Sequence, residues 1–251
     1  MTDATVQGGA EVAPWSSEGT NGIGVLFVHG FTGSPASLRP WAEFISARGY
    51  AVRLPLLPGH GTSPEDLNRT TWSAWYETVE SAYLDLNQKC EKVFICSLSM
   101  GGALTLRLAE LHRPAGIVLV NPLIHIRGIN RILIPIVSRF IALRPAVGND
   151  IKKPGVNEFA YDATPIKAAK SMLGLLSEVR SRIGDVKAPL LLLHSIEDHV
   201  VPSTNAEWIL ANAASTSKKE IVLTDSYHVA TIDNDAPLIF DESLSFIESF
   251  K

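Results

Sequence analysis

Short apolar runs alternate along the chain with longer segments in which apolar residues fall on one helical face. An uninterrupted apolar run is typical of a strand buried on both faces, whereas apolar residues spaced by three and four are typical of a helix. The predicted strands are residues 23–28, 51–54, 93–96, 116–120, 190–193 and 220–223, and the predicted helices are residues 37–48, 71–88, 100–111, 203–213 and 236–250. Repeated strand–helix units predict an α/β fold, with a mostly parallel sheet covered by helices on both faces.

Residues 122–187 interrupt this alternation. The segment contains no clear strand, and it is too long for a plain loop in a compact domain. We therefore predict a core domain formed by residues 1–121 and 188–251, with residues 122–187 inserted as a helical cap. Between Ile129 and Ile141 the apolar residues are spaced along one helical face, although Pro135 is expected to kink or interrupt that helix. This apolar face either packs on the core or contacts micelles and membranes.

The segment around Ser99 carries the strongest chemical signal. A predicted strand leads to Ser99, and Gly101 and Gly102 follow before a helical pattern begins. This is the layout of a nucleophile elbow, a turn so sharp that its central side chain is pushed outward and its flanking residues must be small. Ser97 stands where the usual G-x-S-x-G pattern has its first glycine. The alternative interpretation is a helix that simply opens with glycines after a buried strand.

A serine nucleophile needs a base to take its proton, and the base needs a carboxylate to orient it. His228 and Asp198 each follow a predicted strand, so both are expected at the same edge of the sheet as Ser99. Glu197 is the local competitor for the acid, and residues 120–122, after the preceding strand, offer no carboxylate. The order Ser99, Asp198, His228 is the order of catalytic residues in α/β-hydrolases.

An oxyanion hole requires two backbone N–H groups that point at the developing negative charge. Met100 is expected to supply one, because it follows the nucleophile at a helix N-terminus, and Phe31, in the loop after the first strand, is expected to supply the other. We expect structural roles for the histidines in the same motifs: His29, His60, His194 and His199. For His29 a catalytic role is the alternative.

Composition narrows the possible partners. The chain has 251 residues, 46% of them hydrophobic and 19% charged, and a formal net charge of −4, which gives no indication of nucleic-acid binding. Cys90 and Cys96 show no metal-site spacing and are expected to be free buried thiols in a reducing compartment. The first residues lack the apolar centre of a signal peptide, and no apolar stretch approaches the ~18 residues of a membrane span. We therefore expect a cytoplasmic protein without metal or cofactor, with peripheral membrane contact through the cap left open.

Five motifs together resemble the bacterial monoacylglycerol lipases, which are α/β-hydrolases related to small carboxylesterases. They begin at His29 (His-Gly-Phe-Thr-Gly), Leu57 (Leu-Pro-Gly-His-Gly-Thr), Leu98 (Leu-Ser-Met-Gly-Gly), Glu197 (Glu-Asp-His-Val-Val-Pro) and Ser226 (Ser-Tyr-His-Val-Ala-Thr). The resemblance runs from about Gly22 to the last helix and is thinnest in the first part of the cap.

The resemblance implies a serine hydrolase that cleaves monoacylglycerol to a fatty acid and glycerol, with Ser99, Asp198 and His228 as its triad and no cofactor. It also implies a cap with an acyl tunnel and a small polar pocket for glycerol. In that family a glutamate in a Glu-x-Ala-Tyr setting binds a glycerol hydroxyl, and Glu158 matches it here. The alternative for Glu158 is a solvated surface residue. Two alternatives for the whole protein are a general carboxylesterase for short- or medium-chain esters and a non-catalytic ligand-binding protein of the same fold.

Overall fold

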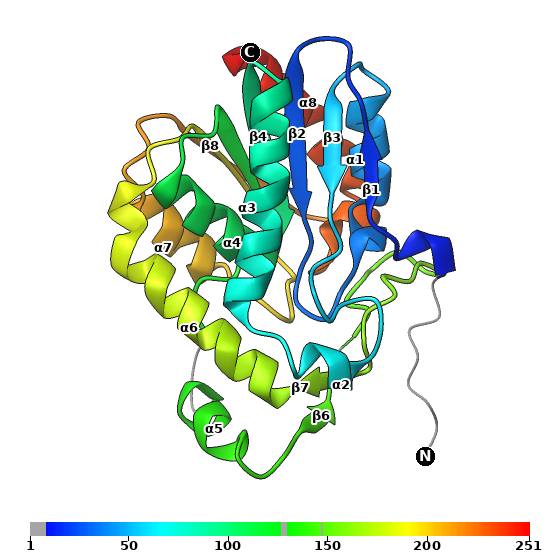
Figure 1. Cartoon of the computed structure of the whole chain (residues 1–251), viewed down its shortest axis with the longest axis vertical. Helices are drawn as coiled ribbons and strands as arrows, with labels where there is room; N and C mark the ends of the chain where they lie inside the picture. The colour runs from blue at the N-terminus through cyan, green and yellow to red at the C-terminus, as the bar shows by residue number, and fades with distance from the viewer. Residues whose placement is uncertain (1–8, 127–129, 147) are drawn as a thin grey trace.

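A seven-stranded sheet forms the centre of the computed structural model, which describes residues 9–126, 130–146 and 148–251 (Figure 1). The strand order is β1-β3-β2-β4-β5-β8-β9, and only β1 is antiparallel to its neighbour. The strands are β1 (Trp15–Ser17), β2 (Ile23–Val28), β3 (Ala51–Leu54), β4 (Lys92–Leu98), β5 (Gly116–Val120), β8 (Leu190–Ser195) and β9 (Lys218–Leu223). The predicted mostly parallel sheet is therefore confirmed, and β1 is an addition at its edge.

Helices cover both faces of the sheet and create two apolar cores. One face carries α3 (Trp72–Lys89), α4 (Met100–Leu111), α6 (Ile166–Arg182) and α7 (Thr204–Asn212), and the other carries α1 (Arg39–Ser46) and α8 (Ala236–Phe250) (Figure 1). Successive residues of β2 alternate between the two, since Leu26 belongs to the first core and Phe27 to the second. This explains why the strands read as uninterrupted apolar runs.

The segment 122–187 contains α5 (Asn130–Val137), β6 (Leu143–Pro145), β7 (Ala163–Pro165), α6 and a short 3₁₀ helix, Ile183–Asp185. The expectation of no strand is wrong, because β6 and β7 form a small antiparallel sheet. Each has only three residues, too few to produce an alternating pattern in the sequence. Figure 1 shows α5, β6 and β7 beyond the carboxyl ends of β2 and β3, whereas α6 packs along α3 and α4.

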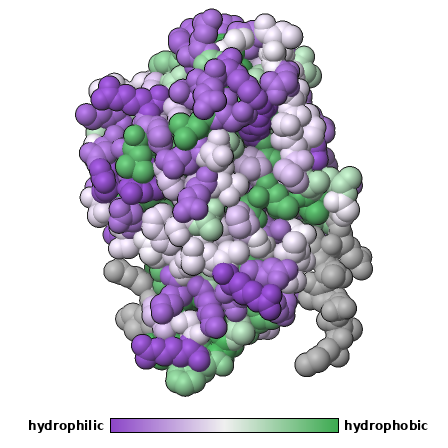
Figure 2. Space-filling model, viewed as in Figure 1, coloured by the Kyte–Doolittle hydropathy of each residue, from purple (hydrophilic) through white to green (hydrophobic). Residues whose placement is uncertain are grey.

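The apolar stripe predicted for residues 129–141, which covers α5 and the turn after it, is largely uncovered in the part that the structure describes. Phe140 is 83% exposed and Ile136 is 53% exposed, and Ile141 is exposed as well. Pro135 lies inside α5 without interrupting it, and the helix ends at Val137. Ile129, the first residue of the predicted stripe, lies outside the described residues. At the end of the molecule where α5 lies, Figure 2 shows some apolar side chains at the tip, with hydrophilic side chains beside them.

Both cysteines are free thiols, Cys96 buried and Cys90 half-buried. Within residues 9–126, 130–146 and 148–251, none of the helices combines the length and apolar character needed to cross a membrane.

Candidate active site

Ser99 lies in the turn between β4 and α4, and its backbone has the unusual angles φ 57° and ψ −121°. A non-glycine residue in this region carries roughly 1–3 kcal/mol of strain, which the surrounding structure must hold. Three backbone hydrogen bonds do so: Ser99 N–H donates to the carbonyl of Val120 at 3.0 Å, and the carbonyl of Ser99 accepts from the N–H groups of Gly102 at 2.9 Å and Leu123 at 3.1 Å. A Cβ on Gly101 would collide with the backbone of Val28, so only glycine fits there. The predicted elbow is therefore present.

Ser97 occupies the position of the usual first glycine without disturbing the turn. Its side chain is buried, and its hydroxyl donates to the carbonyl of Val118 on the neighbouring strand at 3.3 Å. The hydroxyl is thus satisfied within the sheet, away from Ser99.

The side chains of Ser99, His228 and Asp198 form one chain of hydrogen bonds. The distance from Ser99 Oγ to His228 Nε2 is 2.9 Å, and that from His228 Nδ1 to Asp198 Oδ2 is 2.8 Å. Because a carboxylate only accepts, Nδ1 carries the proton and Nε2 is free to accept from the serine. The other oxygen of Asp198 accepts from the backbone N–H groups of Val200 at 2.8 Å and Val201 at 2.6 Å. Glu197, the competing acid, instead pairs with Lys152 at 3.3 Å.

The electrostatic surroundings of His228 favour its charged form. Burial by itself lowers the pKa of His228, but the hydrogen bond and charge of Asp198, assisted by the charges of Glu158 and Asp150, raise that pKa above its ordinary value. A base with a raised pKa holds a proton more firmly once it has taken it from the serine. The site is thus arranged to stabilise an imidazolium between Ser99 and Asp198.

His29 and His60 have the opposite environment. Burial lowers the pKa of His29 to about 4, despite its hydrogen bond to Gly30, and burial also lowers the pKa of His60 well below its ordinary value. His29 is therefore neutral: Nδ1 donates to the carbonyl of Gly30 at 3.0 Å, and Nε2 accepts from the N–H of Leu57 at 3.2 Å. These bonds tie the loop after β2 to the loop after β3, which matches the expected structural role.

The loop after β2 runs close beside Ser99. A Cβ on Gly30 would lie 3.2 Å from the Cβ of Ser99. Phe31 and Ser99 line the same cavity, and Met100 is the first residue of α4, directly after Ser99. Of the two residues expected to supply oxyanion N–H groups, Phe31 thus shares a cavity with the candidate nucleophile and Met100 adjoins it in the chain.

The cavity at Ser99 has a volume of about 280 Å³. Its polar side chains include Ser99, His228, Asp150 and Glu158, and its apolar lining includes Phe31, Leu123, Ile126, Met172, Val200 and Val201. An apolar cavity with a few convergent polar groups is typical of a small-molecule site. Within the described parts of the chain, no group of three or more His, Cys, Asp or Glu side chains could hold a metal ion.

Glu158 lies on the wall of this cavity, partly buried. Its Oε1 accepts from the N–H of Asn149 at 2.7 Å, and its own N–H donates to Asn149 Oδ1 at 3.0 Å. Burial raises the pKa of Glu158, which the hydrogen bond from Asn149 and the charge of His228 partly offset. The alternative of a fully solvated surface residue does not fit this setting.

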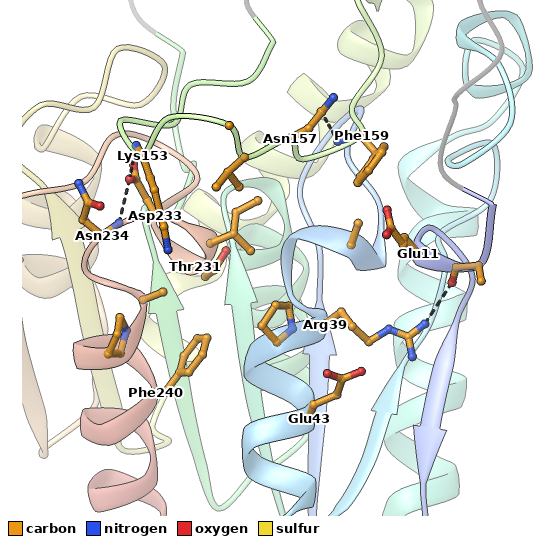
Figure 3. Close-up of a pocket in the computed structure, with 18 residues that line it drawn as sticks. Glu11, Arg39, Glu43, Lys153, Asn157, Phe159, Thr231, Asp233, Asn234 and Phe240 are labelled. Carbon is orange, nitrogen blue, oxygen red and sulfur yellow. Dashed lines mark hydrogen bonds between the residues drawn. The ribbon is translucent and has the colours of Figure 1, made fainter.

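The segment 153–159 separates the cavity from a second hollow of about 840 Å³, which lies between this segment, α1 and α8. Figure 3 shows Asn157 and Phe159 at the second hollow, and Asn157 Oδ1 accepts from the N–H of Phe159 at 2.8 Å. Phe159 has a positive φ of 54°, an uncommon angle for a bulky residue. This local turn allows Glu158 to face the Ser99 cavity while its neighbours face the other hollow.

Two residues of the site were missed by sequence reasoning. Asn121, which follows β5, accepts from the N–H of Ser195 at 2.7 Å and donates to the carbonyl of His228 at 2.7 Å. Asp150 accepts from the N–H of His228 at 3.1 Å. Asn121 directly follows a predicted strand, and this position could have indicated that it lies near the site. Nothing in the local sequence distinguishes Asp150 from a surface aspartate.

Known proteins resemble this chain over most of its length. Residues 22–235 match the family described as serine aminopeptidase, S33. The chain is 43% identical over 227 residues to the thermostable monoacylglycerol lipase of Bacillus sp. (strain H-257), covering 89% of this chain and 90% of that protein. It is 27% identical over 226 residues to a carboxylesterase of Bacillus subtilis (strain 168), covering 89% and 92%.

A solved structure from the work on LipS and LipT, two metagenome-derived lipolytic enzymes, superposes with a TM-score of 0.92 at 40% identity, covering 96% of this chain and 98% of that one. The resemblance to bacterial monoacylglycerol lipases is confirmed by the 43% identity. With its sheet order, its elbow and its family match, the chain is an α/β-hydrolase and belongs to the serine aminopeptidase, S33, family.

Proposed function

We propose that this protein is a serine hydrolase that cleaves monoacylglycerol to a free fatty acid and glycerol through an acyl-enzyme. The observation that carries the proposal is the hydrogen-bonded chain Ser99–His228–Asp198 at the wall of an apolar cavity. The 43% identity to a monoacylglycerol lipase supports the substrate class.

Acylation begins with His228. Its Nε2 takes the proton of Ser99 Oγ, and the oxygen attacks the carbonyl carbon of the ester. The electron pair of the C=O bond moves to the oxygen, and the N–H groups of Phe31 and Met100 stabilise the resulting oxyanion. Met100 gains from its place at the N-terminus of α4, where the helix dipole favours negative charge.

The tetrahedral intermediate then collapses, and the bond between the carbonyl carbon and the glycerol oxygen breaks. His228 gives its proton to that oxygen, so glycerol leaves as a neutral alcohol and the acyl group remains on Ser99. Water repeats the sequence: His228 removes its proton, the hydroxide attacks the acyl carbon, and Ser99 recovers its proton as the fatty acid leaves. Asp198 orients the ring of His228 throughout, because its two oxygens accept from His228 Nδ1 and from backbone N–H groups.

Glu158 is proposed to bind a hydroxyl of the glycerol leaving group. It lies on the wall of the cavity that contains Ser99, and Asn149 fixes one of its oxygens. The other oxygen remains as an acceptor for a substrate hydroxyl. The apolar lining residues, among them Leu123, Ile126 and Met172, suit the acyl chain.

Residues 122–187 are proposed to act as a cap over the cavity. Asp150, Glu158 and Met172 from this segment line the cavity together with residues of the core. The exposed apolar side chains of Ile136, Phe140 and Ile141 are proposed to contact micelles or membranes that contain the substrate.

A substrate comparison tests the proposed function and its carboxylesterase alternative. Hydrolysis rates are measured for a monoacylglycerol and for the methyl ester of the same fatty acid, with Ser99→Ala as the inactive control. A monoacylglycerol lipase prefers the glycerol ester, whereas a general carboxylesterase cleaves both at similar rates. If Ser99→Ala keeps its activity, Ser99 is not the nucleophile.

Glu158→Ala sharpens the same comparison. A hydrogen bond to a charged group contributes roughly 1.5–3 kcal/mol, so its loss is expected to lower kcat/KM for the monoacylglycerol by about 10- to 150-fold. The methyl ester has no hydroxyl for Glu158 to bind, and its kcat/KM is expected to change by less than about 3-fold. Equal losses on both substrates would indicate structural damage, and no loss on either would contradict the glycerol site.

A further inference from the structure

Asp150 connects two loops that carry the candidate base and acid. Its Oδ2 accepts from the backbone N–H of His228 at 3.1 Å and from the backbone N–H of His199 at 3.3 Å. Its Oδ1 accepts from His199 Nδ1 at 2.7 Å, and its backbone carbonyl accepts from the N–H of Val229 at 3.1 Å. Only 10% of the Asp150 side chain is exposed. A single carboxylate of segment 122–187 thus binds both loops at once.

The positions of these loops determine the geometry of the triad. His199 directly follows Asp198, so the acid loop is held on one side of Asp150 and the base loop on the other. The hydrogen bond of 2.8 Å between His228 Nδ1 and Asp198 Oδ2 requires the two loops to keep a fixed separation. A small displacement of either loop would lengthen this bond or the one to Ser99.

A second carboxylate keeps Asp150 itself in place. Asp233 is buried, and its oxygens accept from the N–H groups of Lys152 at 2.7 Å, Lys153 at 2.8 Å and Tyr227 at 2.9 Å. Figure 3 shows Lys153 beside Asp233. Residues 150–153 are therefore joined to residues 227–229 at several points, and Asp150 is held rigidly enough to impose a position on His228.

We propose that Asp150 is a positioning residue for ester hydrolysis, which holds the His228 loop and the Asp198 loop in register and so orients His228 between Ser99 and Asp198. The inference rests on the proposed function, because it assigns a role within the same site. Although Asp150 lines the cavity, in this role it acts through the backbone of His228 and not on the reacting atoms.

The charge of Asp150 gives this role a second readout. The groups whose charges raise the pKa of His228 are Asp198, Glu158 and Asp150, while burial lowers it. Removing the charge of Asp150 therefore lowers the pKa of His228 and moves the acid limb of the pH profile to lower pH. A purely structural residue would not move this limb.

The neighbouring residue offers a matched comparison. Asn149 binds both the carboxylate and the backbone of Glu158, whereas Asp150 binds the backbone of His228. Asn149→Ala is expected to impair only the monoacylglycerol, through Glu158. Asp150→Ala is expected to impair the monoacylglycerol and the methyl ester equally, because both reactions need His228.

The experiment uses the full chain with Asp150→Asn, Asp150→Ala and, as the control, Asp162→Asn, an exposed aspartate of the same segment. Steady-state kinetics on both substrates are measured across about pH 5–9, with the melting temperature of each variant. Asp150→Ala is expected to lower kcat by about 10- to 100-fold on both substrates, with KM within about 3-fold. Asp150→Asn keeps one oxygen acceptor, so its kcat falls less, but its acid limb moves to lower pH. Asp162→Asn is expected to match the wild type.

Several outcomes would overturn the inference. Wild-type kcat and an unmoved acid limb in Asp150→Asn would do so, as would a lowered melting temperature with unchanged kinetics. A rise in KM confined to the monoacylglycerol would assign Asp150 to the glycerol pocket instead. If Asp150→Ala does not fold, the Asn variant decides the matter. The Ser99→Ala variant separates failure of this inference from failure of the proposed function. If Ser99→Ala is inactive and the Asp150 variants behave as wild type, the inference about Asp150 fails and the proposed function stands.

Discussion

At the residue scale, the reaction depends on the charge state of His228. Only the neutral ring can accept the proton of Ser99, so kcat/KM is expected to fall as pH drops through the pKa of His228 in the free enzyme. The reference value of a histidine alone predicts a limb near pH ~6.5. In the structure, burial lowers this pKa but the bond and charge of Asp198 more than compensate, so the limb is expected above that value.

Asp198→Asn tests the source of this shift. The variant loses the charge that orients and stabilises the imidazolium, so kcat is expected to fall by roughly 10⁴-fold, and any residual activity is expected to show its acid limb at lower pH. Glu197→Gln is the matched control, because Glu197 is the adjacent acid and pairs with Lys152 instead. Activity that persists unchanged down to pH ~4.5 in the wild type would exclude His228 as the base.

Replacing Ser97 with glycine tests whether its side chain contributes to the reaction. Its hydroxyl donates to Val118 inside the sheet and does not face the reacting atoms, so Ser97→Gly is expected to keep kcat/KM within about tenfold, or about 1.4 kcal/mol in barrier. The lost hydrogen bond and the greater freedom of glycine are expected to lower the unfolding free energy by about 1–2 kcal/mol. Urea unfolding and ester hydrolysis measure the two effects separately. A loss of activity beyond ~10³-fold would mean that Ser97 acts within the site.

The residues that could be predicted from the sequence share one property. Ser99, Asp198 and His228 each follow a strand of the main sheet, and the carboxyl ends of parallel strands meet at one edge of a sheet. Asp150 follows no strand of the main sheet, and its partners His199 and His228 are distant in the chain. Its role depends on how segment 122–187 folds back over the core, and local sequence patterns carry no information about that.

At the element scale, length decided which elements the sequence could predict. The long helices α3, α4 and α8 and the apolar strands β2, β4 and β5 lie where the pattern places them, within a few residues. The misses are β1, β6 and β7, each with three residues, and the short helix α2, Pro64–Leu67. For segment 122–187 the sequence predicted a helical cap without the position of each helix. In the structure, α6 of this segment packs on α3 and α4 as part of the helical layer.

The exposed apolar residues of α5 and of the turn after it lead to a prediction about lipid surfaces. Ile136 and Phe140 are exposed, so replacing either with aspartate removes apolar contact area without opening a core. Ile136→Asp and Phe140→Asp are expected to weaken binding to phospholipid vesicles, with melting temperatures close to that of the wild type. Leu84→Asp, at an exposed position of α3, is the control and is expected to leave vesicle binding unchanged. A large drop in melting temperature with unchanged vesicle binding would show that the stripe packs on the core.

At the scale of the whole molecule, the site depends on a sheet edge that several loops share. Hydrogen bonds between side chains and backbone join these loops: the ring of His29 accepts from Leu57, and the amide of Asn121 accepts from Ser195 and donates to His228. Most of these groups are buried and neutral, so they add stability without adding charge near Ser99. This arrangement makes the free energy of unfolding fall as pH falls, because buried neutral histidines take up protons when the chain unfolds.

His29 gives the magnitude of that effect. Burial lowers its pKa to about 4, whereas an unfolded histidine titrates near ~6.5, so below that value the unfolded chain binds the proton more strongly. Stability is therefore lost as pH falls, and this residue accounts for about 2 kcal/mol between pH ~7 and ~4.5. His60 acts in the same direction, and His228, whose pKa is raised, acts in the opposite one because its contribution is lost as pH rises.

Urea unfolding at the two pH values, for wild type and for His29→Gln, measures this contribution. Glutamine can donate to Gly30 and accept from Leu57 but does not titrate, so the variant is expected to be less stable at neutral pH yet to lose about 2 kcal/mol less on acidification. Taking the difference between the two proteins cancels the carboxylates and the other histidines, which are common to both. An equal loss in both proteins would mean that His29 is protonated in the folded state, and its ring could not then accept from Leu57.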